Sequence, residues 1–304
     1  MKIGMLFPDY GSQYVGMGKE LYDLSRVMQE YFEEASTCLD KNFVKLCFAS
    51  SESELALIEN AYPALFLLSC SIGALLKEKG MACQEVAGYG IGQLSALNVA
   101  GSLTLPDGLY FLSKYAQFYQ EQLETMQARC VCISGVPVDK VKKWCEEFRH
   151  VSIAVYHSLT ECVVSGLNQE IVGIKDLALK MEAQISEVPI EAGMHSQLMT
   201  PVEQQLRVYL EKIDFHDFSC PLISSIDGTR ITNGRVVREE VMKQLIIPIH
   251  WDKVMQTIAD WQLVVQCGPG SSLKNTVEAF YPEKKFIAIN NPDDIDELLK
   301  LIHK

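Results

Sequence analysis

The sequence contains ten cysteines but lacks any C-x-x-C pair, the spacing most typical of a zinc site or a redox disulfide. This absence predicts free, packed thiols in a reducing compartment, with no metal and no cofactor. Basic residues are also scarce, because Lys and Arg number 27 against 39 Asp and Glu, a formal net charge of −12. Nucleic-acid-binding proteins need a basic face, so this charge excludes that class of partner.

The chain also lacks an uninterrupted apolar run of membrane-spanning length. The longest apolar stretch, residues 64–72, is interrupted by Ser and Cys and is too short to cross a bilayer. Residues 2–7 read as a strand rather than as a charged leader followed by an apolar region and a cleavage site. We therefore expect a cytoplasmic protein with no membrane partner.

No internal repeat, low-complexity run or linker rich in Pro, Gly or Ser divides the 304 residues. Apolar strands alternate with amphipathic helices, which indicates a parallel sheet flanked by helices. The strands are expected at residues 2–7, 85–87, 221–225 and 263–267. Helices are expected up to about residue 40, at 61–79, from 93 onward and at 109–126.

Residues 129–188 have a different order of elements. Strands at 129–134, 151–156, 162–166 and 185–188 and helices at 139–148 and 169–181 give the sequence β-α-β-β-α-β. That order is typical of a ferredoxin-like unit. The predicted fold class is therefore α/β, with an α/β hydrolase-like core at residues 1–127 and 190–304. A ferredoxin-like subdomain is inserted in it at 128–189.

Five segments carry a resemblance to one family over essentially the whole chain. Their order and spacing match, although each short motif alone would be weak. They read F-P-D-Y-G-S-Q at 7–13, G-Y-G-I-G-Q at 88–93, G-M-H-S at 193–196, Q-L-I-I-P-I-H-W at 244–251 and C-G-P-G at 267–270.

These segments resemble the malonyl-CoA:acyl carrier protein transacylases, whose corresponding motifs include F-P-G-Q-G-S-Q, G-H-S-L-G-E and V-G-P-G. The resemblance implies an acyl transfer in which a serine at a strand-to-helix turn attacks a thioester. A histidine takes the serine proton, and two backbone N–H groups hold the oxyanion. It also implies acyl-CoA and an acyl carrier protein as partners.

The nucleophile position in this sequence is Gly90, which has no side chain to acylate. The nearby Ser95 lies in the following helix and is expected to point elsewhere. Glycine tolerates the strained backbone of such a turn, so losing the serine relieves strain at the expense of activity. An alternative, a dinucleotide-binding loop, requires G-x-G-x-x-G, whereas the spacing here is G-x-G-x-G.

Other positions depart from the family pattern as well. The arginine that pairs with the malonyl carboxylate falls at Tyr115, and a phenol cannot supply its charge. Tyr62, Tyr89 and His157 also replace pocket residues, beside Met194. We expect the tyrosines to narrow or fill the acyl tunnel.

Some site positions are retained. His195 stands at the general-base position, and Gln244 stands where a main-chain carbonyl orients that histidine. The backbone N–H groups of Tyr10 and Ile91 match the oxyanion hole.

Without a serine, His195 is either a packed remnant or a base for another nucleophile. The candidate substitutes, which the spacing does not favour, are Ser12, Ser196 and Cys267.

Three hypotheses follow from this pattern. The first is a non-catalytic relative that still binds an acyl carrier protein or an acyl group. Lys140, Lys142, Lys143 and Arg149 are candidates for contacting an acidic carrier protein, or else form an ordinary solvated helix face. The second is an active acyltransferase or thioester hydrolase that uses His195 with water or an unusual nucleophile. The third is a structural role in a fatty-acid or polyketide synthase assembly.

Overall fold

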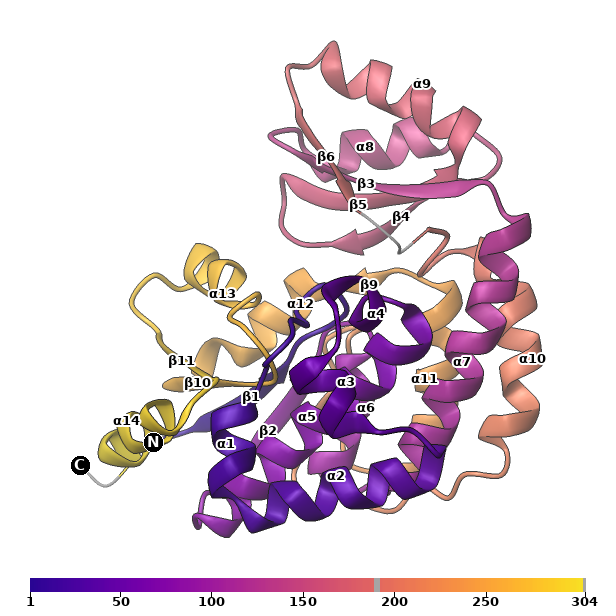
Figure 1. Ribbon diagram of the computed structural model, residues 1–304. Coiled ribbons are helices and arrows are strands. Elements are labelled where there is room, and N and C mark those ends of the chain that lie inside the picture. The colour runs from indigo at the N-terminus through magenta and orange to yellow at the C-terminus, as the bar shows by residue number, and fades with distance from the viewer. Residues whose placement is uncertain (189–191, 303–304) are drawn as a thin grey trace.

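The larger of two sheets contains six strands in the order β11-β10-β1-β2-β7-β8. The computed structural model describes residues 1–188 and 192–302 (Figure 1). Five of these strands are parallel, and β8 pairs antiparallel with β7. The strands are β1 (Ile3–Phe7), β2 (Glu85–Gly88), β7 (Leu222–Ile223), β8 (Arg230–Ile231), β10 (Leu263–Cys267) and β11 (Lys285–Ile289).

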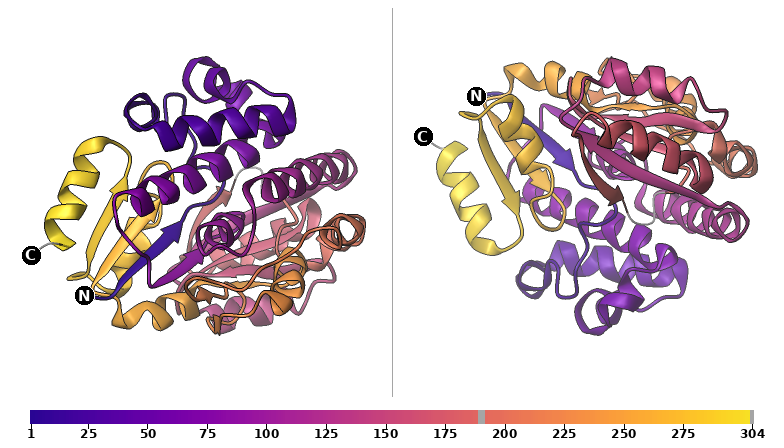
Figure 2. Two further views of the ribbon diagram at one scale, coloured as in Figure 1. Left: turned by 90° about the horizontal axis from the view of Figure 1, so that it is seen from below. Right: turned by 90° about the horizontal axis from the view of Figure 1, so that it is seen from above.

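The centre of this sheet is covered on both faces. Every residue of β1 is buried, as is typical of a parallel strand between two layers. Successive side chains point to opposite faces, so Met5 and Phe7 join one apolar cluster while Leu6 joins another. Figure 2 shows the N-terminal helices and the small subdomain on opposite sides of the large sheet.

The first face is covered by long helices, chiefly α2 (Arg26–Leu39), α5 (Ile58–Glu78), α6 (Gly92–Val99), α7 (Leu105–Thr125) and α10 (Thr200–Leu210). Among the described residues, α5 alone is long and apolar enough to cross a membrane, but 89% of its apolar window is buried inside the protein. It is therefore the central core helix.

The other helices are short or lie at the edges of the sheet. They are α1 (Lys19–Leu24), α3 (Phe43–Ala49), α4 (Glu52–Leu55), α11 (Gly234–Ile246), α12 (Trp251–Thr257), α13 (Lys274–Phe280) and α14 (Pro292–Ile302). Two 3₁₀ turns complete the core, η1 (Gln197–Met199) and η2 (Ile258–Asp260).

The smaller sheet has the order β6-β3-β5-β4-β9. It consists of β3 (Ala128–Ser134), β4 (Val151–Tyr156), β5 (Glu161–Leu167), β6 (Gln184–Val188) and the added β9 (Ile249–His250). The helices α8 (Val138–Cys145) and α9 (Asn168–Leu179) pack on the face turned away from the large sheet (Figure 1). The other face of the small sheet packs on the core through Val155, Val163 and Trp251.

The predicted α/β fold with a small inserted unit is confirmed, with a few differences at the element ends. The predicted helix 139–148 ends at Cys145, and the predicted strand 221–225 is reduced to Leu222–Ile223. The parallel addition of β9 to the small sheet was not predicted, because two residues carry no periodic signal. The predicted boundary at 189–190 lies outside the described residues.

Candidate functional site

The turn between β2 and α6 holds Gly90 in a left-handed conformation, with φ +53°. The Gly92 amide donates to the Tyr89 carbonyl at 2.9 Å, which closes the turn. A residue with a Cβ atom is disfavoured by about 1–2 kcal/mol in this conformation. Glycine therefore fits the turn without strain, but offers no atom for covalent chemistry.

The space beside Gly90 is taken by Asp9. β1 and β2 are parallel neighbours with Phe7 opposite Gly88, so two residues further on Asp9 lies beside Gly90. A Cβ atom at position 90 would lie only 1.6 Å from the Asp9 Oδ2 atom, and Asp9 is buried. The carboxylate thus fills the space in which a nucleophilic side chain would begin.

The same carboxylate also engages the expected oxyanion donor. The Ile91 amide donates to Asp9 Oδ1 at 3.0 Å, just before the N-terminus of α6. A helix N-terminus favours a negative group, so the pairing is electrostatically favourable. The chain therefore holds its own carboxylate at one of the two backbone N–H groups that were predicted to bind the oxyanion. The sequence contains a sign of this carboxylate, because Asp9 stands at the third position of F-P-D-Y-G-S-Q, where the family motif has glycine.

His195 lies on the other side of this turn, buried and with φ +53°. Its Nδ1–H donates to the Gln244 main-chain carbonyl at 2.6 Å. The Gln244 side chain donates to the Gly90 carbonyl at 3.0 Å and to Ser225 Oγ at 3.1 Å. These contacts connect α11 to the turn and hold the imidazole in one orientation.

Burial lowers the pKa of His195 to about 4, and the hydrogen bond to the Gln244 carbonyl opposes this shift only in part. The imidazole is therefore neutral at neutral pH, with Nε2 able to accept a proton. To act as a general base, this nitrogen needs a hydroxyl, thiol or water proton within hydrogen-bond distance.

The substitute nucleophiles are engaged elsewhere. Ser12 Oγ donates to the Asp9 carbonyl at 2.6 Å, and Ser196 Oγ donates to the Gly193 carbonyl at 2.6 Å. Cys267 is enclosed in the core, where burial raises the pKa of its thiol. Within the described part of the chain, no hydrogen bond joins a hydroxyl or thiol to His195.

Tyrosines pack where the acyl tunnel was expected. Tyr62 and Tyr115 are 2% and 3% exposed, with ring centroids 5.5 Å apart. The Tyr115 hydroxyl donates to Met194 Sδ at 3.1 Å. The Tyr10 ring lies 6.0 Å from that of Tyr62, and its hydroxyl donates to the Ala56 carbonyl at 2.8 Å. These aromatic contacts form one buried cluster beside the turn.

The space left at this site is small. A cavity of about 20 Å³ remains, lined by residues that include Gly90, Tyr115, Met194, His195 and Gln244. A single water molecule needs roughly 10–15 Å³ measured in the same way. The cavity therefore has room for one water but not for an acyl thioester.

Tyr89 and His157 lie in a different place, on the side of the small subdomain. The Tyr89 hydroxyl is 2.7 Å from His157 Nε2, and its ring packs edge-on against Trp251. His157 Nδ1 lies 3.0 Å from Glu161 Oε1. The predicted acyl-pocket set thus divides into two groups, with Tyr62, Tyr115 and Met194 in one and Tyr89 and His157 in the other.

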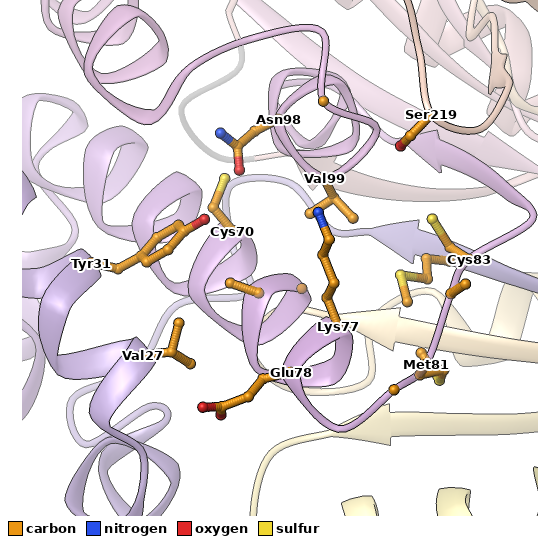
Figure 3. A pocket seen from close by; sticks show the side chains of 16 residues that line it. Val27, Tyr31, Cys70, Lys77, Glu78, Met81, Cys83, Asn98, Val99 and Ser219 are labelled. Carbon is orange, nitrogen blue, oxygen red and sulfur yellow. The ribbon is translucent and has the colours of Figure 1, made fainter.

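A far larger cavity, of about 650 Å³, lies near the amino ends of β1 and β2 (Figure 3). Side chains from α2, α5 and α6 line it, including Tyr31, Lys77 and Asn98. Its wall also contains Cys83, whose Sγ atom is 3.0 Å from that of Cys220. This cavity was not predicted from the sequence, because its lining comes from residues far apart in the chain.

Comparison with known proteins places this architecture among the acyl transferases. Residues 5–282 match the family model of the acyl transferase domain. The chain therefore belongs to that family.

Relatives with assigned names identify a narrower family within the acyl transferases. The chain is 30% identical over 303 residues to a malonyl CoA-acyl carrier protein transacylase from Bacillus subtilis, covering 97% of this chain and 95% of the relative. It is 27% identical to the transacylase of that name from Escherichia coli K12, with 99% of each chain covered. The crystal structure of FabD from Acinetobacter baumannii superposes with a TM-score of 0.93 at 26% identity, covering 99% of this chain and 98% of the other. The protein is thus a member of the malonyl-CoA:acyl carrier protein transacylase family.

Proposed function

We propose that this chain is a non-catalytic member of its family that binds an acyl carrier protein without transferring an acyl group. One observation carries the proposal: the Asp9 carboxylate fills the space beside Gly90 and accepts the Ile91 amide hydrogen. An acyl transfer needs a nucleophile and a free oxyanion donor at this turn. Here the first is absent and the second is engaged.

The surroundings support the same conclusion. At the position that resembles the family's arginine, Tyr115 supplies no positive charge for a malonyl carboxylate. The buried rings of Tyr62 and Tyr115 leave a cavity of about 20 Å³ at the turn. Acyl selection and acyl binding at this end of the sheet are therefore lost together with the nucleophile.

Binding to a carrier protein is the part of the family's role that we propose is kept. The relatives named above are acyl carrier protein transacylases, and one structure of similar fold, with a TM-score of 0.94, is a malonyl-transacylase in complex with a type II PKS acyl-carrier protein. Lys140, Lys142, Lys143 and Arg149 are exposed on or after α8, on the outer side of the small subdomain. These four basic side chains, which alternate with the exposed Asp139, Glu146 and Glu147, are the contacts that we propose for an acidic partner.

A second candidate function is thioester hydrolysis. The observation in its favour is the retained contact between His195 and the Gln244 carbonyl, which orients a neutral base beside a cavity for one water. It requires Asp9 and the tyrosines to move aside for the substrate. The experiment below therefore also measures the release of free CoA.

The test is incubation of the intact protein with malonyl-, acetyl- and longer acyl-CoA, followed by mass spectrometry and a free-CoA assay. We expect an unchanged mass and no CoA release above the rate without protein. A stable acyl adduct or transfer to a carrier protein would overturn the proposal. CoA release without an adduct, abolished in His195→Ala, would support the hydrolase instead.

Variants at two positions separate the missing serine from the carboxylate. We expect Gly90→Ser alone to stay inactive, because its Cβ atom conflicts with Asp9. The double variant Asp9→Gly/Gly90→Ser frees the Ile91 amide, and with Tyr115→Ala added to open the space that the ring fills it should self-acylate with acetyl-CoA. Asp9→Gly/Gly90→Ala with Tyr115→Ala is the matched control and should gain no mass. Efficient acylation of the single Gly90→Ser variant would show that Asp9 does not close the site.

Carrier-protein binding is tested separately by calorimetry with a holo acyl carrier protein. Lys142→Glu/Lys143→Glu should weaken binding by about tenfold or more at low salt, because it reverses the charge of the exposed face of α8. Lys45→Glu/Lys79→Glu makes the same charge change on the core and serves as the control. Equal affinities of the two double variants would exclude α8 as the docking surface.

A further inference from the structure

Three metal-binding side chains meet on the small sheet. Cys132 Sγ, a ring nitrogen of His157 and a carboxylate oxygen of Glu161 all lie within 4.8 Å of one another. Within residues 1–188 and 192–302, no other group of three His, Cys, Asp or Glu side chains is so arranged. The group is separate from Gly90 and His195, so its interpretation does not depend on the proposed function.

The strand register explains why these residues meet. In the antiparallel pair β3 and β5, Cys132 lies opposite Val163 and Ser134 lies opposite Glu161. Side chains two residues apart share a face, so Cys132 and Glu161 are diagonal neighbours on one surface. His157, at the end of β4, faces Glu161 across the hairpin, where its amide donates to the Glu161 carbonyl at 3.0 Å.

The donor set distinguishes between metals. A thiolate, an imidazole and a carboxylate are the ligands that zinc uses in proteins, whereas magnesium and calcium prefer oxygen atoms alone. The three residues come from sequence positions with no zinc-type spacing. Only the folded sheet brings them together.

The distance between the histidine and glutamate ligands also suits a zinc ion. Zinc bonds to nitrogen and oxygen are about 2.0–2.1 Å long, so two such ligands at tetrahedral angles lie about 3.3 Å apart. His157 Nδ1 and Glu161 Oε1 are already 3.0 Å apart and need to separate only slightly. His157 Nε2 faces the Tyr89 hydroxyl at 2.7 Å, the outer hydrogen bond that typically orients a metal-bound histidine.

We propose that Cys132, His157 and Glu161 bind one divalent zinc-class ion, with water as the fourth ligand and Tyr89 orienting His157. On binding, a metal–sulfur bond forms and the thiol proton leaves to solvent. The side chains of His157 and Glu161 are 21% and 45% exposed, so an ion can enter from solvent. Tyr89 then connects the ion on the small subdomain to the turn of the core.

The test is titration of the full chain with Co²⁺ after removal of metals by a chelator under reducing conditions. Cobalt bound by a thiolate gives a near-ultraviolet charge-transfer band, and tetrahedral sites give intense visible bands. We expect both to saturate at one Co²⁺ per chain and to disappear when Zn²⁺ is added. A titration without a charge-transfer band would overturn the proposal.

Variants assign the ligands. Cys132→Ser should abolish the charge-transfer band, and Glu161→Gln should weaken binding. Tyr89→Phe should weaken affinity by about tenfold, because it removes only the outer hydrogen bond. Cys38→Ser removes an exposed thiol on α2 and should change nothing. A band that persists in Cys132→Ser would place the metal elsewhere and refute the assignment.

A measurement on the unaltered chain covers the case in which Cys132→Ser fails to fold. One equivalent of Zn²⁺ should slow alkylation of Cys132, followed by peptide mass mapping, while Cys38 reacts at its original rate. Alkylation of Cys132 at the same rate with and without Zn²⁺ would contradict the proposal.

Discussion

The two ends of β2 differ in how completely the chain fills the space around them. At the carboxyl end, beside Gly90, the remaining cavity is about 20 Å³, whereas the cavity near the amino end is about 650 Å³. In open α/β sheets, ligands bind outside the carboxyl ends of the strands. In this chain Asp9, Tyr62 and Tyr115 fill the carboxyl end, which we call the closed end. The large cavity lies at the amino end, which we call the open end.

The filled site and the large cavity are lined by different parts of the chain. The carboxyl-end site is filled by Asp9, Tyr62 and Tyr115, which, like Gly90, differ from the motif residues of the family. The amino-end cavity is bounded by α2, α5 and α6, with a pair of thiols in or beside its wall. At the carboxyl end, the turn that has no side chain at position 90 also has little free space beside it.

The largest expected effect comes from reopening the closed end. Tyr115→Ala removes a ring that is only 3% exposed, and truncation of a buried aromatic residue costs about 3–5 kcal/mol of unfolding free energy. The new cavity should be apolar enough to bind xenon or benzene. Urea unfolding measures the loss of stability, and a rise in melting temperature with benzene measures the binding.

Tyr115→Phe is the matched control for this change. It removes only the hydroxyl that contacts Met194, so we expect a loss below about 1.5 kcal/mol and no benzene effect. If Tyr115→Ala is no less stable than Tyr115→Phe, the ring does not fill the site.

The next effect concerns His195 at the closed end. Its pKa is about 4 in the folded chain against an ordinary value of 6.5, because burial disfavours the charged form. The unfolded chain therefore binds an extra proton between these values, and stability falls as pH decreases from about 6.5 to 4. The full loss is about 3 kcal/mol, since each pKa unit corresponds to about 1.4 kcal/mol.

Unfolding free energies measured at a series of pH values check this expectation. His195→Gln has no titrating group at this position, so its stability should change less over the same range. Parallel pH profiles for the two proteins would mean that the imidazole is not buried in its neutral form.

The smallest effect concerns the open end. A hydrogen bond joins the sulfur atoms of Cys83 and Cys220, and it lowers the pKa of Cys83. In Cys220→Ala the Cys83 pKa should rise, and its alkylation at neutral pH should slow by up to about tenfold, since the thiolate is the reactive form. Peptide mapping after iodoacetamide treatment gives the rate, with Cys38 as the internal reference. An unchanged rate at Cys83 would show that the pair is not hydrogen-bonded.

Much of the fold could be predicted from the sequence. The largely apolar residues of β1 and β10 predict central parallel strands, and their predicted ranges differ from the observed ones by one residue at most. The order β-α-β-β-α-β between 128 and 188 predicts the small sheet. Short elements such as β9 could not be predicted, because their pairing depends on a partner strand distant in sequence.

The candidate site was predictable only residue by residue. The absence of a side chain at Gly90 is evident from the motif, and so are the positions of His195 and Gln244. The role of Asp9 was missed, because it follows from the pairing of Phe7 with Gly88 across two strands. The division of the tyrosines between two regions also depends on packing: Tyr62 and Tyr115 face the core, whereas Tyr89 faces His157.

The sequence by itself determined the family, the order of the elements and the glycine at the expected nucleophile position, since these depend on local periodicity and on motifs along the chain. Only the tertiary structure decided what occupies the vacated position and which side chains of the small subdomain meet. The physical reason is that strand pairing joins residues far apart in sequence. The partners of Asp9 and of Cys132 are therefore set by register, which no single segment encodes.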